Sequence, residues 1–138
     1  MADYKYEASL ITKEGVDALL KFLPYFCNKR SRFGTQSKNI DMTVIPSTLT
    51  KKANDFYEAC YEHKFVQNFD WGKWSQSQQS LVHNGDGIES LDLTDIGRLL
   101  MTHIRGDRFC DGHLLAVMRS GQIARILERL AVLRENKT

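Results

Sequence analysis

The sequence has few cysteines, few prolines and no long hydrophobic run. Its three cysteines, Cys27, Cys60 and Cys110, cannot all pair, and so low a number is typical of a reducing compartment. Two prolines and 42% hydrophobic residues exclude disordered and collagen-like chains. No hydrophobic run approaches the roughly 18 residues that a membrane-spanning helix needs. The first residues lack the pattern of a signal peptide, so we expect a cytoplasmic protein without a membrane anchor.

The length of 138 residues fits one domain, and we predict a single helical domain over residues 1–138. Thirteen of the fourteen aromatic residues lie in residues 1–74, whereas the C-terminal half offers mainly aliphatic side chains. Neither half has the composition of a complete core. We therefore expect an aromatic layer to pack on an aliphatic layer.

The spacing of hydrophobic residues predicts an all-α fold, a compact bundle of five to six helices with one or two short accessory strands. Capping residues, glycines and a proline set the expected helix boundaries. These boundaries are Thr12 to Pro24, Ser47 or Thr48 to about Lys64, Asp70 to the turn at Asn84, Asp92 to Gly106, Asp111 to Gly121, and Gly121 onwards. The expected strands lie at Ile40–Val44 and around Tyr4 and Tyr6.

Charge is segregated along the chain, although the net charge is only +2. Residues 18–40 carry five basic and no acidic residues, and residues 98–138 carry eight basic and four acidic residues. If these two basic blocks meet on one surface, that surface attracts a polyanion; otherwise they neutralise acidic neighbours. The pI of about 8.4 lies below the values above about 9 that nucleic-acid-binding domains show, which favours neutralisation.

Residues 25–33 interleave aromatic rings with the cations Lys29, Arg30 and Arg32. Grooves for single-stranded nucleic acid use this mixture, because bases stack on rings and phosphates pair with cations. A surface loop in which Tyr25 and Phe26 dock into the core has the same composition. We favour the loop interpretation.

The densest group of chemically active side chains lies between His103 and His113, which enclose two arginines, two aspartates and a cysteine. An aspartate can orient His103 as a general base, and Arg105 or Arg108 can hold a phosphate or a carboxylate. The candidate catalytic residues are therefore His103, Arg105, Asp107 and Arg108. No nucleophile elbow, phosphate loop, metalloprotease helix or Rossmann glycine pattern accompanies them.

The same segment also has the composition of a joint between two helices, and we favour this second interpretation. Asp107 and Asp111 then bind arginines or cap the next helix, and Phe109 fills the core. His103, on the apolar stripe of its helix, is then a core histidine whose hydrogen bonds are satisfied.

Two Cys/His pairs suggest a metal site. Cys60 with His63, and Cys110 with His113, are each three residues apart, so each pair points roughly one way on a helix. Together they have the donors of a tetrahedral zinc site. The spacing is not that of a zinc knuckle or finger, and we expect neither a metal nor another cofactor.

Residues 111–135 have the outline of a helix-turn-helix. Gln122 and Arg125 fall at the start of its second helix, the position from which such motifs contact bases, and Arg119 and Arg129 can reach phosphates. A plain αα-hairpin has the same outline and is the interpretation that we favour.

Four segments carry a resemblance to a known family. They are Phe69–Trp74, with Trp71 and Trp74; Leu99–Leu114, which contains the run HIRGDRFCDGHL; Ser120–Ile123; and Leu127–Leu130. With these segments the chain resembles a family of small bacterial proteins of unknown function that occur in Gram-positive bacteria and on mobile elements. The resemblance implies a cytosolic bacterial or phage protein. It implies no reaction and no catalytic residues.

We therefore predict a binding or regulatory module that engages a protein partner rather than nucleic acid. The alternatives are a small hydrolase or nucleic-acid-acting enzyme, and a helix-turn-helix DNA binder. The residues expected to bind the partner are Lys29, Arg30, Arg32, Arg105, Asp107, Arg108, Asp111 and His113. A concave pocket at His103 favours catalysis, whereas a flat or convex surface favours binding.

Overall fold

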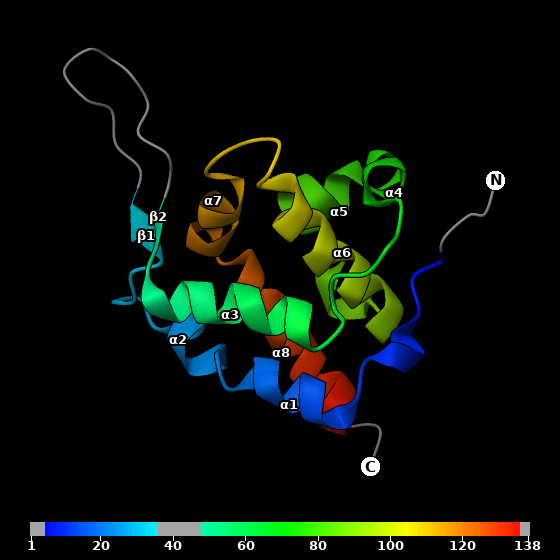
Figure 1. The fold of residues 1–138 in the computed structure, drawn as a ribbon, viewed down its shortest axis with the longest axis horizontal. Helices are drawn as coiled ribbons and strands as arrows, with labels where there is room; N and C mark the ends of the chain where they lie inside the picture. The colour runs from blue at the N-terminus through cyan, green and yellow to red at the C-terminus, as the bar shows by residue number, and fades with distance from the viewer. Residues whose placement is uncertain (1–4, 36–47, 136–138) are drawn as a thin grey trace.

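The computed structural model describes residues 5–35 and 48–135. Its helices are α1 (Lys13–Leu20), α2 (Leu23–Cys27), α3 (Lys51–Glu62), α4 (Trp71–Ser77), α5 (Gln79–Asn84), α6 (Leu93–Gly106), α7 (His113–Ser120) and α8 (Gln122–Glu135), with 3-10 turns η1 (Ala8–Leu10) and η2 (Ile88–Ser90). The predicted all-α bundle is confirmed (Figure 1). Its described helices outnumber the five to six expected, because the chain breaks at two places that the sequence does not predict: a separate short helix, α2, follows α1, and the helix expected from Asp70 is divided in two.

The first of these breaks concerns Pro24. Thr12 caps α1 as predicted, and its hydroxyl accepts a hydrogen bond from the Gly15 amide at 3.0 Å. The helix nevertheless ends at Leu20, before the proline, and Pro24 stands in the first turn of α2. Proline is favoured there because the first turn needs no backbone N–H donor. Pro24 therefore begins a helix instead of ending one.

The second break divides the helix that Asp70 begins. The Asp70 carboxylate caps α4 as predicted, accepting from the Lys73 amide at 3.0 Å. Gln78 then leaves helical geometry, with φ −127° and ψ 40°, and separates α4 from α5. The cap of α3 also differs from the prediction: Thr50 fills it, not Ser47 or Thr48.

The strands lie elsewhere than predicted. Strands β1 (Gly34–Thr35) and β2 (Thr48–Leu49) pair antiparallel, with Gly34 opposite Leu49. The expected strand at Ile40–Val44 lies outside the described residues, as does Tyr4. Tyr6 is buried but belongs to no strand. Gly34 is required in β1, because a Cβ at this position would lie 2.3 Å from the Thr48 carbonyl oxygen of β2.

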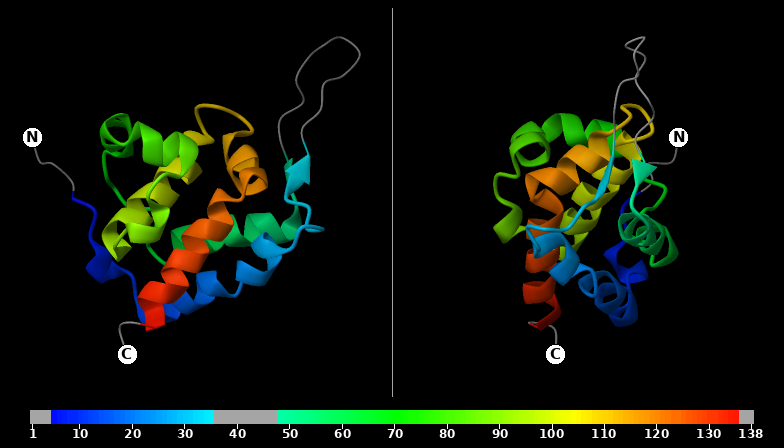
Figure 2. Two further views of the ribbon diagram at one scale, coloured as in Figure 1. Left: turned by 180° about the vertical axis from the view of Figure 1, so that it is seen from behind. Right: turned by 90° about the vertical axis from the view of Figure 1, so that its left-hand side faces the viewer.

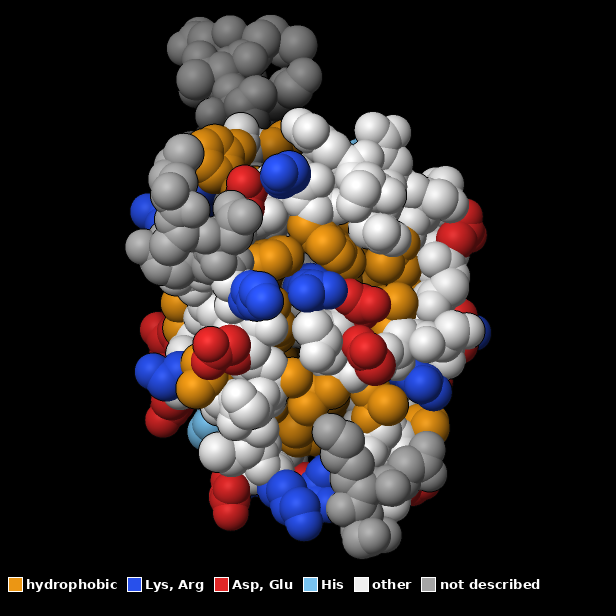
Figure 3. All heavy atoms as spheres, turned by 90° about the vertical axis from the view of Figure 1, so that its right-hand side faces the viewer, with side chains coloured by type: hydrophobic (Ala, Val, Ile, Leu, Met, Phe, Trp, Pro, Cys, Tyr) orange, Lys and Arg blue, Asp and Glu red, His pale blue; other side chains and the backbone are white. Residues whose placement is uncertain are grey.

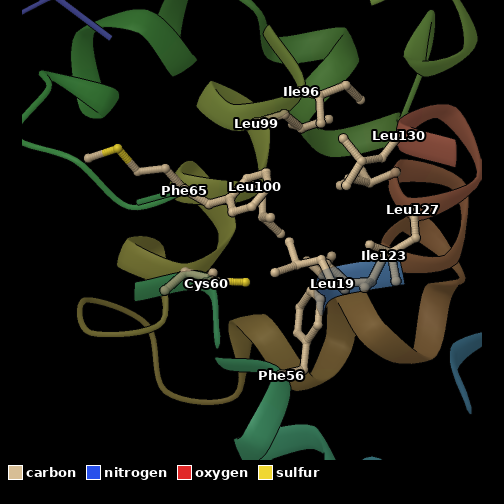
Figure 4. Packing of buried hydrophobic residues seen from close by; sticks show 14 of the residues in the cluster. Leu19, Phe56, Cys60, Phe65, Ile96, Leu99, Leu100, Ile123, Leu127 and Leu130 are labelled. Carbon is tan, nitrogen blue, oxygen red and sulfur yellow. The ribbon is translucent and has the colours of Figure 1, made fainter. Parts of the chain in front are cut away.

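The core lies around α6 and α8, which pack against each other side by side (Figure 2). Helix α8 contacts α1, α2, α6 and α7, and α6 also contacts α4 and α5. Both halves of the chain contribute to one hydrophobic cluster, as predicted. Fully buried members include Leu19, Phe56, Phe65, Leu99, Leu100, Ile123 and Leu127 (Figure 4). Within residues 5–35 and 48–135, every helix is too short or too polar to span a bilayer.

Candidate functional site

The candidate site is built around the loop that joins α6 to α7, residues 107–112, hereafter the α6–α7 loop (Figure 1). The loop is a series of tight turns, in which the amides of Phe109 and Cys110 donate to the Gly106 carbonyl at 3.1 and 3.0 Å. Helix α7 begins after Gly112, which has a φ of +87° and, as a glycine, has no side chain to cap the helix. The predicted cap by Asp111 is therefore wrong. Asp107 fills this role from across the loop, because its Oδ1 accepts from the Leu114 amide at 3.0 Å.

Beneath the loop, two histidines and a glutamine form a hydrogen-bonded chain. His103 Nδ1 lies 3.1 Å from His113 Nε2, and His103 Nε2 lies 3.0 Å from Gln122 Oε1. The Gln122 amide nitrogen faces the carbonyl oxygens of Val82 and His83, at 3.4 Å each. Since these carbonyls only accept, Gln122 Oε1 must face His103.

This orientation fixes the proton on each ring. His103 Nε2–H donates to Gln122 Oε1. His103 Nδ1 is therefore unprotonated in the neutral ring and accepts a hydrogen bond. His113 Nε2–H is that donor. The chain is satisfied when both histidines are neutral, and it still holds when His113 alone is protonated. It breaks when His103 is protonated at Nδ1 while His113 Nε2–H still points at it.

Burial lowers the pKa of both histidine rings. His103 is fully buried, which together with His113 lowers the pKa of His103 to about 4. Burial also lowers the pKa of His113, while the nearby Asp107 carboxylate acts to raise it and His83 to lower it. Both histidines are therefore neutral at neutral pH. His103 is the satisfied core histidine that one interpretation of the sequence predicted.

Above the histidines, the loop presents an exposed aromatic ring. Phe109 is 82% exposed, so the expectation that it fills the core is wrong. Its ring centroid lies 5.7 Å from that of Trp71, the first residue of α4. Arg108 and Asp111 are also exposed, while Arg105 and Asp107 are half-buried.

Helix α3 also faces this loop through Tyr57. Burial, followed by the neighbouring Tyr61, raises the pKa of the Tyr57 hydroxyl to about 12. Arg108 acts to lower this pKa and Asp107 to raise it. The surface of the loop thus combines aromatic rings from three segments of the chain with charges of both signs. No sequence signal connects Trp71 with Phe109, or Tyr57 with Asp107 and Arg108, because these neighbours are brought together by the tertiary fold.

The two Cys/His pairs do not converge on a metal site. Cys60 is fully buried in α3, and burial raises the pKa of its thiol well above the usual value. Cys110 is exposed in the α6–α7 loop, and His113 is hydrogen-bonded to His103. In the part of the chain that the structure describes, no three His, Cys, Asp or Glu side chains are placed to hold a metal ion.

The helix-turn-helix outline is present, but its expected DNA contacts are used inside the protein. Gly121 separates α7 from α8 as predicted. Gln122 is buried in the histidine chain, and Arg125 forms a two-point ion pair with Glu89, at 2.9 Å each. Arg129 Nε donates to the Leu91 carbonyl at 2.8 Å. This arrangement favours the plain αα-hairpin. Gln122 is the first residue of α8 and precedes its apolar stripe, so no local sequence signal marks its buried role.

The remaining predicted residues lie on the segment between α2 and β1. Lys29, Arg30 and Arg32 are all exposed there. Lys29 and Arg32 line a hollow together with Arg119 of α7. One residue from the second basic block of the sequence therefore meets the first block on one surface.

The fold and the site define a small, mostly helical protein with an aromatic loop over a hydrogen-bonded histidine pair, of which His103 is buried. The model of the DUF6508 family, a family of unknown function, matches residues 11–136, and the chain belongs to this family. No curated protein matches the sequence, and neither does any solved structure. Membership in a family of unknown function agrees with the resemblance found in the sequence; the HIRGDRFCDGHL signature, the bacterial origin and the mobile elements stay predictions.

Proposed function

We propose that this protein is a binding module that engages a protein partner through the α6–α7 loop. The observation that carries the proposal is the position of Phe109, which is 82% exposed while the rest of its segment is held in tight turns. A ring carried on a backbone that is already held in turns loses less backbone freedom on binding than a ring on an unconstrained segment. Exposed aromatic side chains beside arginines are typical of the residues that dominate protein interfaces.

The chemistry of the surface indicates what the partner offers. Phe109 and Trp71 form an apolar contact, and the exposed Arg108 flanks it. A complementary partner has a shallow apolar pocket for the Phe109 ring, with a carboxylate or a backbone carbonyl placed for Arg108. Arg105, Asp107, Asp111 and His113 border the same loop and complete the proposed contact surface.

Binding is favoured over catalysis because of the state of His103. The hydrolase alternative needs this imidazole in contact with a substrate, yet the side chain is fully buried and both ring nitrogens are hydrogen-bonded within the protein. The proposal includes the single domain, the cytoplasmic location and the bacterial origin that the sequence predicts.

The experiment is affinity capture from a lysate of the native host, followed by titration of the purified partner by calorimetry. We expect Phe109→Ser to weaken binding by about tenfold or more, because an aromatic anchor is removed without a loss of core packing. Arg108→Ser should weaken binding less, since its charge lies at the edge of the contact.

The matched control is Val132→Ser, which removes an exposed hydrophobic side chain of α8 that is 44% exposed. This variant should bind the partner as the unchanged protein does. Circular dichroism of every variant verifies the fold. The proposal is wrong if no protein is captured specifically, or if Phe109→Ser binds as tightly as Val132→Ser.

A further inference from the structure

A second surface, formed by the α2–β1 segment and Arg119 of α7, has the features of an anion site. A hollow of about 460 Å³ lies between the α2–β1 segment and α7. The charged side chains among its described lining are Lys29, Arg32 and Arg119, all basic. It adjoins a second hollow of about 300 Å³, and the two share Lys29, Ser31, Phe33 and Arg119 as lining residues.

The backbone beneath these cations is held at consecutive carbonyl groups. The Arg32 carbonyl accepts from the hydroxyls of Tyr25 and Thr50, and the Phe33 carbonyl accepts from the Thr50 amide at 2.9 Å. The Gly34 carbonyl accepts from Arg119 Nη2 at 3.0 Å. A segment fixed at three successive residues presents its side chains in a defined place, which lowers the entropy cost of binding a ligand.

The turn that precedes this segment is fixed as well. Asn28 Oδ1 accepts from the Arg30 amide at 2.9 Å, and the Asn28 carbonyl accepts from the Ser31 amide at 3.0 Å. This side-chain turn is a usual role of asparagine. Lys29 is therefore carried on a closed turn beside the hollow.

The cations of the hollow have no ion-pair partner among residues 5–35 and 48–135. None of the ion pairs between described residues includes Lys29, Arg32 or Arg119. One N–H group of Arg119 donates to the Gly34 carbonyl. A guanidinium carries five N–H donors, so others remain for a ligand. By contrast, the face of the molecule that carries α4 shows acidic and basic side chains mixed among hydrophobic ones (Figure 3).

An aromatic ring lies beside these charges. Phe33 is half-buried and lines both hollows. It stacks on the buried Phe26, with ring centroids 5.3 Å apart and an angle of 22° between the planes. Its orientation is therefore set by the core. A fixed ring next to cations is the combination that binds a base and its phosphate together.

The two ends of the combined hollow differ in charge. Cys27 lines the second hollow, and burial followed by the Glu128 carboxylate raises the pKa of its thiol. The negative charge of Glu128 thus acts on that end. A phosphate is favoured at the opposite end, where Arg32, Gly34 and Arg119 meet.

We propose that this hollow binds a nucleotide unit, with its phosphate on Lys29, Arg32 and Arg119 and its base against Phe33. The unit comes either from a free nucleotide or from single-stranded nucleic acid, whose phosphate and base have the same chemistry. The carboxylates of an acidic peptide match the charge of the cations, but they supply no planar ring to stack on Phe33. The site is independent of the partner surface at Phe109.

The test is fluorescence anisotropy at low salt with two probes, a fluorescein-labelled oligothymidylate and a fluorescent ATP analogue. We expect at least one probe to bind, and the difference in affinity between them identifies the source of the nucleotide. The double variant Lys29→Gln, Arg32→Gln should weaken binding about tenfold or more. It should also lower the slope of log Kd against log salt concentration by up to about 0.7, the contribution of one neutralised phosphate of a single strand. Phe33→Leu, which keeps an apolar side chain in place, should weaken binding about tenfold by loss of stacking.

Two control variants separate this site from general charge and from the partner surface. Lys73→Gln removes an exposed lysine of α4, and Phe109→Ser removes the proposed partner anchor; both should bind the probes unchanged. Circular dichroism and thermal unfolding verify the fold of each variant. The inference is overturned if neither probe binds, if the double variant binds as Lys73→Gln does, if Phe33→Leu has no effect, or if polyglutamate competes as well as unlabelled oligothymidylate.

Discussion

Tyr6 packs its ring directly over Gly97 in the middle of α6, where a Cβ on residue 97 would lie 2.1 Å from the Tyr6 hydroxyl oxygen. The hydroxyl donates to the Phe65 carbonyl at 2.7 Å, which fixes the ring in this position. Three segments far apart in the sequence are thereby tied together at one point. The absence of a side chain at Gly97 is what permits the contact.

Gly97→Ala should therefore destabilise the protein. Alanine favours a helix by about 1 kcal/mol over glycine, but overpacking a rigid core costs about 1–3 kcal/mol. The Tyr6 ring cannot move aside without losing its hydrogen bond to Phe65. We expect a net loss of up to about 2 kcal/mol in the free energy of unfolding, measured by urea denaturation.

Gly72→Ala is the matched control, because the Cβ it adds to α4 would meet nothing closer than Asp70 Oδ1 at 3.8 Å. This variant should be neutral or slightly stabilising. In a double-mutant cycle, Tyr6→Leu should reduce the cost of Gly97→Ala. Equal effects of the two glycine substitutions would show that Tyr6 does not constrain Gly97.

The helices with strong local signals could be predicted from the sequence. Helix α6 has an apolar stripe and an acidic cap, and Asp92 accepts from the Asp95 amide at 2.8 Å as its position indicates. Thr12 and Asp70 cap helices for the same reason. The period of hydrophobic residues and the capping residues are local properties, so they predict these helices without knowledge of the tertiary fold.

The site depended on contacts that no local pattern contains. The chain from His103 to Gln122 and the pairing of Phe109 with Trp71 arise from helix packing. Hydrophobicity alone predicted that Phe109 fills the core, yet nearby turns hold it in solvent. The sequence predicts that Pro24 ends a helix, because the residue before a proline avoids helical angles. The first turn of a helix accepts proline equally well, and only the fold decides between the two positions.

Stability should fall in mild acid because of His103. In the folded protein its pKa is about 4, below the 6.5 of an unperturbed histidine, so the unfolded state binds more protons between these two pH values. The free energy of unfolding is therefore highest above pH 6.5 and decreases as the pH falls towards 4. For His103 the full decrease is of the order of 3 kcal/mol. The lowered pKa of His113 contributes with the same sign.

Urea denaturation across this pH window measures the effect. His103→Gln should be less stable at neutral pH, because the hydrogen-bonded chain is disturbed, but its stability should depend less on pH. His63→Gln is the control, since His63 packs beside Gly15 of α1 and not in the histidine chain. A slope that is equal in the His103 and His63 variants would contradict the assignment.

Asp107 has two separable effects, and two substitutions distinguish them. As a cap, its Oδ1 accepts from the Leu114 amide at 3.0 Å; as a charge, it acts to raise the pKa of His113 against the effect of burial. Asp107→Ala removes both, and we expect a loss of about 1 kcal/mol in stability together with a lower His113 pKa. Asp107→Asn keeps an oxygen that can accept from Leu114 but has no charge. It should retain most of the stability while the His113 pKa still falls. Thermal unfolding and NMR titration of the histidine ring protons measure the two quantities. If Asp107→Asn left the His113 pKa unchanged, the carboxylate would not act on the histidine pair, and the α6–α7 loop would be coupled to it through the backbone alone.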